Sequence, residues 1–367
     1  MKRAPADDRK WMRQAIALAR LSEGHTHPNP PVGAVVVRDG RKLGEGRHRC
    51  AGGAHAEVAA FDACRGSARG ATLYVTLEPC CTHGRTPPCT DRILCEGVAR
   101  VVVGCCDKNA LHCGRGLDIL KEHGVEVVCG VCEDDARDLV RPFFKHVTTG
   151  LPFVTLKLAM TLDGRIADRE HRSKWITGEA ARAEVQRMRR RADAMLVGAG
   201  TVCADDPSLL CRIRGGGELM RVVVDASGRT PPEAKVYTDE AASRTIVATT
   251  PQGASLKGER WSRHGAQVWI FSADKNGRIP LKRVLRRLGD AGLLHVLCEG
   301  GGQLAGALHD AGLVDEYAFF YAPVILGDTR AVSGMAGRGR LLTGAERLRM
   351  VETRRLGEDV LIRAERK

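Results

Sequence analysis

The sequence HAEVAAF at residues 55–61, followed by EPCCTHGRTPPC at residues 78–89, decides how the first half of the chain is interpreted. His55 offers an imidazole nitrogen, and Cys80 and Cys89 offer sulfurs, which are ligand types that zinc prefers. A zinc ion with three protein ligands keeps its fourth tetrahedral position for water. The pattern therefore predicts an open zinc site.

Glu57 adds the catalytic part of the pattern, because a carboxylate two residues after the histidine can exchange a proton with the activated water. The general signature of zinc deaminases is His-x-Glu followed by Pro-Cys-x-x-Cys. Here the two outer cysteines are nine positions apart, and Cys81 follows the first. The alternative is a closed structural site in which Cys81 or His83 is the fourth ligand, but it would leave Glu57 without a task.

The segments around this pattern predict a layered α/β domain. An amphipathic helix over residues 7–24 precedes a hairpin over residues 32–48, whose turn is Asp39-Gly40. The rest alternates between helices at 55–64, 87–97, 116–124 and 133–150 and strands at 71–79, 100–105 and 125–129.

A second α/β pattern begins at the joint GLPF, residues 150–153. We place the domain boundary after residue 147, which gives domains 1–147 and 148–367. The expected strands lie at 153–167, 194–200, 221–226, 244–250, 266–271, 294–300 and 316–327, and the expected helices at 177–193, 280–292 and 301–312, the first with Thr177 as its N-cap.

Composition narrows the class of protein. Of the 367 residues, 43% are hydrophobic and 28% are charged, which is typical of a globular protein, and no apolar run approaches the roughly 20 residues of a membrane helix. The N-terminal residues carry scattered charges where a signal peptide needs a clean apolar segment. The fourteen cysteines are then expected to remain thiols, and we expect a cytoplasmic location and no membrane partner.

The net charge of +13 is distributed over both halves, with 22 basic against 18 acidic residues through residue 147 and 35 against 26 after it. An excess of basic residues is compatible with binding to nucleic acid, but it is equally compatible with binding to a phosphorylated small molecule and a dinucleotide. Because only 4% of residues are aromatic, few stacking platforms for single-stranded nucleic acid exist. We expect a small phosphorylated substrate and no nucleic-acid partner.

Several motifs resemble one known family. HPNPPVG, HAEVAAF, TLYVTLEPCCTHGRTPPC and GRGLDILKEHG are similar to the deaminase domain of the bifunctional deaminase-reductases of riboflavin biosynthesis. LKLAMTLDGRIA, WITG, VGAGTVCADDPSL and CEGGGQLAGALHDAGLVDE are similar to the reductase domain of that family. The resemblance extends over residues 8–365. It implies a cytidine-deaminase-like α/β/α domain followed by a dihydrofolate-reductase-like α/β domain, with zinc and NADPH as cofactors and a homo-oligomeric assembly.

The resemblance also implies roles for individual residues. His55, Cys80 and Cys89 are the zinc ligands, and Glu57 is the catalytic proton carrier. Cofactor contacts are assigned to Ala159, Trp175, Thr201, Asp205, Gly301, Gly302, Gln303, Leu304, Ala305, Gly306 and Ala307. Substrate contacts are assigned to Ser173, Arg189, Leu209, Arg212 and Glu299, with Asn29, His83, Arg85, Lys157 and Asp163 as further candidates.

The expected function is therefore zinc-dependent deamination of 2,5-diamino-6-(5-phosphoribosylamino)pyrimidin-4-one, followed by NADPH-dependent reduction of its ribosyl chain to ribityl. One alternative is a nucleic-acid deaminase with an RNA-binding domain, which would explain the charge but leaves WITG and EGGGQLAGAL without a purpose. Another is a chain in which only the reductase half is active.

Overall fold

The computed structural model describes residues 6–83, 87–213 and 219–367. Contacts divide the chain into two compact units, Met1–Gly150 and Leu151–Lys367. The boundary expected after residue 147 falls inside helix α5 (Glu133–Thr149), so the division lies at the end of this helix. Gly150, with a positive φ of 68°, ends the helix. No helix in the described part of the chain is long and apolar enough to cross a membrane.

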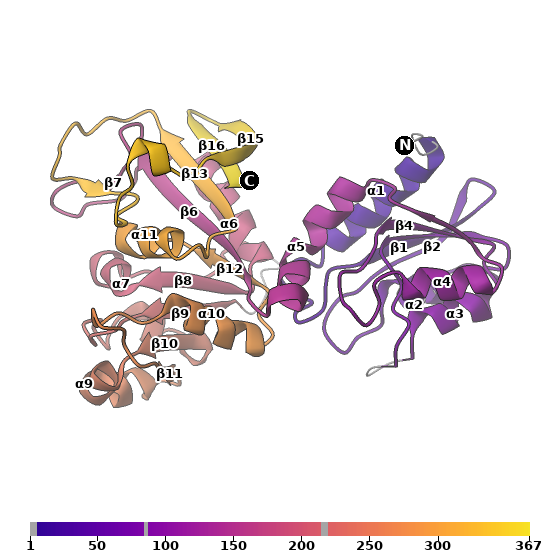
Figure 1. Cartoon of the computed structure of the whole chain (residues 1–367), viewed down its shortest axis with the longest axis horizontal. Helices are drawn as coiled ribbons and strands as arrows, with labels where there is room; N and C mark the ends of the chain where they lie inside the picture. Colours follow the sequence, from indigo (N-terminus) through magenta and orange to yellow (C-terminus); the bar gives the residue numbers. More distant parts are fainter. Residues whose placement is uncertain (1–5, 84–86, 214–218) are drawn as a thin grey trace. The chain divides into compact units, whose positions relative to one another are not determined.

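The N-terminal unit is a sheet between two layers of helices (Figure 1). Its strand order is β2-β1-β3-β4-β5, in which β1 is antiparallel to both neighbours and β3, β4 and β5 are parallel. The strands are β1 (Gly33–Arg38), β2 (Arg41–Arg47), β3 (Thr72–Leu77), β4 (Arg100–Cys105) and β5 (Glu126–Cys129), and the helices besides α5 are α1 (Ala6–Arg20), α2 (Ala56–Asp62), α3 (Cys89–Glu96) and α4 (Arg115–Glu122).

Alternation along the strands produces two cores in this unit. Val35 and Val37 of β1 face α1 and α5, where they pack with Met12 and Leu139. Ala34 and the other alternate positions pack with α2, α3 and α4 on the opposite face. The predicted hairpin is confirmed, since Asp39 and Gly40 both have positive φ, as a tight two-residue turn requires.

The C-terminal unit is built on a nine-stranded sheet of order β11-β10-β9-β8-β12-β6-β13-β16-β15, whose first seven strands are parallel. These seven are β6 (Phe153–Thr161), β8 (Ala194–Gly198), β9 (Met220–Val224), β10 (Thr245–Thr249), β11 (Gln267–Ile270), β12 (His295–Cys298) and β13 (Glu316–Ala322). The antiparallel edge is formed by β15 (Leu348–Leu356) and β16 (Asp359–Arg366), and β7 (Arg165–Ala167) pairs with β14 (Val332–Ser333).

Six α-helices are assigned in the described part of this unit, and both faces of the sheet carry buried apolar clusters. They are α6 (Glu179–Arg191), α7 (Ala199–Asp205), α8 (Lys235–Thr238), α9 (Pro251–Ser262), α10 (Leu281–Asp290) and α11 (Gly302–Asp310). The prediction that Thr177 caps α6 is wrong, because the N-cap is Gly178 and no side chain caps the helix. The backbone N-H of Gly178 is bound by Asp359 at 2.8 Å instead.

Candidate active sites

The three residues predicted to bind zinc meet at the ends of three elements of the N-terminal unit. His55 is the N-cap of α2, Cys80 follows β3, and Cys89 is the first residue of α3. The His55 Nδ1 atom lies 3.2 Å from Cys89 Sγ and 3.5 Å from Cys80 Sγ, and all three ligand atoms lie within 4.8 Å of one another. Bonds of about 2.0–2.3 Å around a tetrahedral zinc separate its ligands by roughly 3.5 Å. The donor set therefore fits zinc.

The two sulfurs of this cluster share a proton unequally. Hydrogen bonds from Cys89 and then from His55 lower the pKa of Cys80 to about 4. The same contact with the Cys80 sulfur raises the pKa of Cys89. The backbone N-H of Cys89 adds a bond of 3.3 Å to Cys80 Sγ, so the cluster favours a thiolate at Cys80.

Glu57 is buried in the first turn of α2, beside this cluster, with 4% of its surface exposed. Burial, followed by the charge of Cys80, raises the pKa of its carboxyl to about 7. A cation at the cluster would lower this pKa, because it favours the carboxylate. A carboxyl group that titrates near neutrality can both accept and return a proton.

Cys81 contacts a different segment of the chain, residues 111–112. Its sulfur lies 3.5 Å from His112 Nδ1 and 3.8 Å from the carbonyl oxygen of Leu111. Among the described residues, the group able to hold a metal comprises only His55, Cys80 and Cys89. Cys81 is a neighbour of the metal position rather than a member of the cluster.

Two residues that the sequence patterns did not single out hold this site in place. The buried carboxylate of Glu78 accepts hydrogen bonds from the backbone N-H groups of Asp107, Gly114 and Gly116 at 2.9–3.0 Å, and it fixes the chain two residues before Cys80. His48 is buried with its ring centroid 5.5 Å from that of His55. The strand-end Glu-Pro-Cys order was the available signal for Glu78.

The further substrate candidates in this unit have different surroundings. Asn29 Nδ2 lies 3.0 Å from Nε2 of His48, so it is one contact away from the ligand His55. His83 is exposed in the segment between the two ligand cysteines. Arg85 lies outside the described residues.

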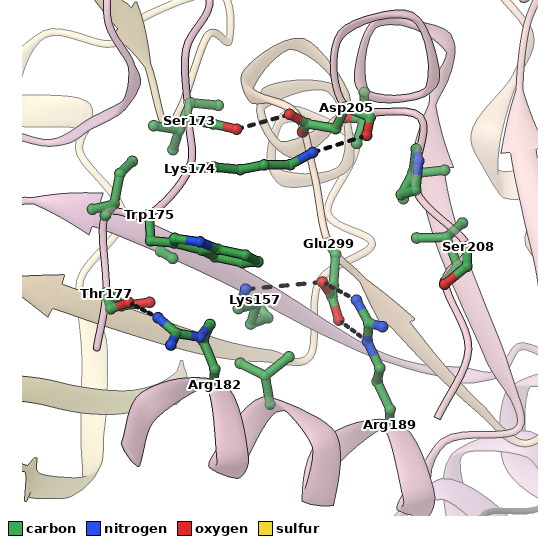
Figure 2. Close-up of a pocket in the computed structure, with 18 of the residues that line it drawn as sticks. Lys157, Ser173, Lys174, Trp175, Thr177, Arg182, Arg189, Asp205, Ser208 and Glu299 are labelled. Carbon is green, nitrogen blue, oxygen red and sulfur yellow. Dashed lines mark hydrogen bonds and ion pairs between the residues drawn. The ribbon is translucent and has the colours of Figure 1, made fainter. Parts of the chain in front are cut away.

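The C-terminal unit contains a cavity of about 930 Å³ next to the carboxyl ends of β6, β8 and β12 (Figure 2). The chain places β12 between β6 and β8, and such a change of strand order opens a crevice at the carboxyl ends of parallel strands. Eleven predicted residues line the cavity: Lys157, Ala159, Ser173, Trp175, Arg189, Thr201, Asp205, Leu209, Arg212, Glu299 and Gly301.

A buried ionic cluster forms one wall of this cavity. Arg189 binds Glu299 through two hydrogen bonds of 2.8 and 3.0 Å, and Lys157 Nζ lies 3.9 Å from the same carboxylate (Figure 2). Burial alone would raise the pKa of Glu299, but the charges of Arg189 and Lys157 lower it to about 2. Burial, together with the charge of Arg189, lowers the pKa of Lys157. The cluster carries one excess positive charge.

Other residues that line the cavity are polar, and one exposed ring lies among them. Ser173 Oγ donates to the Asp205 carboxylate at 2.8 Å, and Lys174 Nζ donates to the Asp205 carbonyl oxygen at 3.2 Å. Trp175 is 70% exposed, and the guanidinium of Arg182 lies 4.7 Å from its ring centroid (Figure 2). This ring offers a flat surface on which an aromatic group can stack.

Of the predicted cofactor stretch 301–307, Gly301 is the member that lines the cavity among the described residues. Its N-H donates to Thr201 Oγ at 2.9 Å. Leu304 and Ala305 are buried in the core. A Cβ at Gly306 would overlap the backbone of residues 336–337. Gly302 is also buried, Gln303 is exposed and Ala307 is half-buried, and none of these three is among the described residues that line the cavity.

Asp163 is not among the described residues that line the cavity. Its carboxylate accepts a hydrogen bond from Thr161 Oγ at 2.6 Å and from the N-H groups of Leu326 and Gly327 at 3.2 and 2.9 Å. These bonds lower the pKa of Asp163 to about 2. The residue therefore fixes the chain that follows β13.

Comparison with known proteins covers both units. Residues 152–362 match the RibD C-terminal domain family, and residues 5–105 match the cytidine and deoxycytidylate deaminase zinc-binding region. The riboflavin biosynthesis protein RibD of Actinobacillus pleuropneumoniae is 40% identical over 97% of this chain and 94% of its own length. RibD of Escherichia coli is 37% identical, with 97% and 98% covered.

Solved structures agree with this similarity. RibD of Acinetobacter baumannii, in one crystal form, superposes with a TM-score of 0.87 at 37% identity, covering 98% of this chain and 99% of that chain. A diaminohydroxyphosphoribosylaminopyrimidine deaminase/5-amino-6-(5-phosphoribosylamino)uracil reductase from Thermotoga maritima gives 0.88 at 36% identity, with the same coverage.

An α/β/α domain with a zinc-type cluster beside a buried glutamate, joined to an α/β domain with a cationic cavity, defines a two-domain deaminase and reductase whose substrate is a small pyrimidine. Because the alignments cover nearly the whole of this chain and of the RibD relatives, they also identify the family. The chain belongs to the RibD family of riboflavin biosynthesis proteins. The predicted family, two-domain α/β fold, enzymatic classes and cofactors, zinc and NADPH, are thereby confirmed.

Proposed function

We propose that the N-terminal unit deaminates 2,5-diamino-6-(5-phosphoribosylamino)pyrimidin-4-one and that the C-terminal unit reduces the ribosyl chain of the product to ribityl. The observation that carries the proposal is the meeting of His55, Cys80 and Cys89 beside the buried carboxyl of Glu57. The paired activities in the name of the Thermotoga maritima protein support the choice of substrate.

In the deaminase site, His55, Cys80 and Cys89 hold the zinc ion, which when bound supplies a Lewis acid that activates water. Glu57 accepts the proton of that water and returns it to the departing amino group, so ammonia leaves and a ring carbonyl forms. Asn29, supported by His48, contacts the pyrimidine. His83 and Arg85 lie in the segment between the two ligand cysteines and bind the phosphoribosyl part.

In the reductase site, the cavity of about 930 Å³ holds both the nicotinamide end of NADPH and the ribosyl chain. Trp175, Ala159, Thr201, Asp205 and the turn at Gly301 contact the cofactor.

The ionic cluster of Arg189, Glu299 and Lys157 binds the substrate. Arg189 and Glu299 fix its polar groups, and Lys157 donates to the ring oxygen that becomes a hydroxyl when hydride reaches the anomeric carbon. Ser173, Leu209 and Arg212 complete the substrate contacts, with Asp163 holding the neighbouring chain.

The proposed reactions also bear on the charge of the protein, its location in the cell and its assembly. A substrate phosphate gives the cationic side chains of both units a partner. Free thiols at the fourteen cysteines and the use of a reduced nicotinamide suit the cytoplasm. We propose a homo-oligomer, and measurement of the mass in solution by light scattering tests this.

Mass spectrometry of the products tests both steps. The protein loaded with zinc is incubated with the diaminopyrimidine substrate, first without and then with NADPH. We expect a net exchange of one NH for one O without NADPH, since water enters and ammonia leaves, and a further gain of two hydrogens with NADPH. An unchanged substrate mass in the first incubation contradicts the deaminase assignment, and a missing second shift contradicts the reductase assignment.

A further inference from the structure

Two thiols of the N-terminal unit face each other outside the zinc cluster. Cys106 directly follows β4, Cys129 ends the neighbouring parallel strand β5, and their sulfurs lie 3.1 Å apart. Both residues are exposed. Since β5 is the edge strand of its sheet, the pair is open to small solutes.

The backbone on both sides of the pair is fixed. The N-H groups of Gly130 and Val131, which follow Cys129, donate to the carbonyl oxygen of Val103 at 3.0 and 3.3 Å. The N-H of Asp107, which follows Cys106, donates to Glu78 at 3.0 Å. The sulfurs therefore have to approach by about 1 Å, through side-chain rotation, to reach the disulfide bond length of roughly 2.05 Å.

Other thiols of this unit are less suited to such a reaction. Cys105 is fully buried, with its sulfur against the carbonyl oxygen of Thr76 at 3.6 Å. Cys80 and Cys89 lie close together, but both belong to the zinc cluster. Among the described residues, no third pair of cysteine sulfurs lies within hydrogen-bonding distance.

We propose that Cys106 and Cys129 form a redox modification site, at which hydrogen peroxide converts the two thiols into a reversible disulfide. One thiol gives up its proton and attacks an oxygen of hydrogen peroxide as the thiolate, the O–O bond breaks, and the departing hydroxide takes that proton, so a sulfenic acid and one water form. The second thiol attacks the sulfenic sulfur, the S–S bond forms, and the hydroxyl leaves as a second water. Two thiols are oxidised and one hydrogen peroxide is reduced to two waters. The site is independent of the identity of the pyrimidine substrate.

The test uses the full chain loaded with zinc and treated with limiting hydrogen peroxide. Free thiols are then alkylated, and the protein is examined by intact mass and by peptide mapping without reduction. We expect a loss of two hydrogens, two fewer alkylated thiols, a peptide that links residues 106 and 129, and complete reversal by dithiothreitol. Zinc content should stay constant, because no ligand takes part.

Matched variants separate this pair from the other thiols. Cys106→Ser and Cys129→Ser should each abolish the linked peptide, whereas Cys203→Ser, at an exposed thiol of the other unit, should leave it unchanged. Because both positions are exposed, deaminase activity of reduced Cys106→Ser should match that of the wild type and report an intact fold. A linked peptide of residues 80 and 89 with loss of zinc would overturn the proposal. So would the same mass loss in Cys106→Ser.

Discussion

The single residue on which the deaminase proposal depends is Glu57. Glu57→Gln preserves the volume of this buried side chain but removes the group that accepts and returns the proton. Ammonia release should fall by about 10²–10⁴-fold, the usual contribution of a general acid-base group. Zinc content, measured by elemental mass spectrometry, should remain at the wild-type value because Glu57 is not a ligand.

The control for this substitution is the second reaction of the same protein. Oxidation of NADPH with the deaminated pyrimidine as substrate should proceed in Glu57→Gln at the wild-type rate. If the variant loses zinc, or if ammonia release persists unchanged, Glu57 does not carry the proton.

Because of Glu299, the free energy of unfolding of the C-terminal unit should depend on pH in the acid range. The pKa of Glu299 is about 2 in the fold, against roughly 4.3 in an unfolded chain. The carboxylate therefore stabilises the fold fully above pH ~4.3. This contribution is lost as the pH falls from ~4.3 through about 2. Glu299→Gln leaves Arg189 and Lys157 buried without their partner, and we expect it to lower the free energy of unfolding by about 3 kcal/mol at pH 7.

Denaturant unfolding of wild type and Glu299→Gln from pH 7 to pH 2 measures this dependence. The difference between the two proteins should be constant down to pH ~5 and then shrink. A difference that does not change with pH would mean that the carboxylate has an ordinary pKa in the fold.

Residues whose chemistry is carried by a compact motif are the easiest to group from sequence. His55, Cys80 and Cys89 lie within one 35-residue stretch, and their residue types, together with the family resemblance, placed them in one group whose ligand atoms lie close together in the structure. Glu78 was missed because its partners are backbone N-H groups, which nearly every residue type offers, and His48 because its contacts with Asn29 and the Ala54 carbonyl oxygen form no motif in the sequence. Such hydrogen bonds depend on the packed fold.

At the scale of elements, α11 is positioned by its glycines. A Cβ at Gly306 would overlap the backbone of Ala336 and Gly337, which cannot move as a flexible side chain could. Gly306→Ala should therefore destabilise the C-terminal unit by about 1–3 kcal/mol, the range for overpacking a core. Thermal unfolding followed by circular dichroism measures the change.

The matched substitution is Gly258→Ala in α9, where the added methyl group meets only the Cβ of Ala254 at an ordinary 3.7 Å. This variant should be about 0.5–1 kcal/mol more stable than wild type, because alanine favours a helix interior. Equal effects of the two substitutions would show that α11 does not pack tightly on residues 336–337.

Two elements that the sequence did not predict, β15 and α9, have weak local signals. In β15 no residue is buried, and its four apolar residues do not alternate regularly with polar ones, so no clear period-2 hydrophobic signal appears. Pairing with β16, which itself pairs with β13, creates this strand. The helix α9 contains two glycines and begins at Pro251, which weakens its helical signal, but Thr250 caps it by accepting a bond from the N-H of Gly253.

At the scale of the whole molecule, the sequence predicts two α/β halves because strand and helix signals alternate along the chain. The strand order of the C-terminal sheet was not predictable in this way. The strand β12 follows β11 in the chain but lies between β8 and β6, which requires contacts across more than 100 residues. This insertion is also what opens the crevice that holds Glu299.

Because each unit has its own hydrophobic core, we expect zinc and NADPH to stabilise different units against thermal unfolding. The buried clusters of each unit are formed by residues of that unit alone, so each unit should unfold in its own calorimetric transition. Removing zinc with a chelator should lower the midpoint of one transition. NADPH at about 100 times its dissociation constant should stabilise the other by about 2.7 kcal/mol, which corresponds to roughly 5–10 °C.

Two variants assign the transitions. His55→Ala should abolish the effect of the chelator without changing the effect of NADPH, because the imidazole belongs to the zinc cluster alone. Trp175→Ala should do the reverse, since its exposed ring lines the cavity of the other unit. A single transition, or an equal shift of both midpoints by either ligand, would contradict independent unfolding, and the two active sites are then coupled in stability as well as joined in one chain.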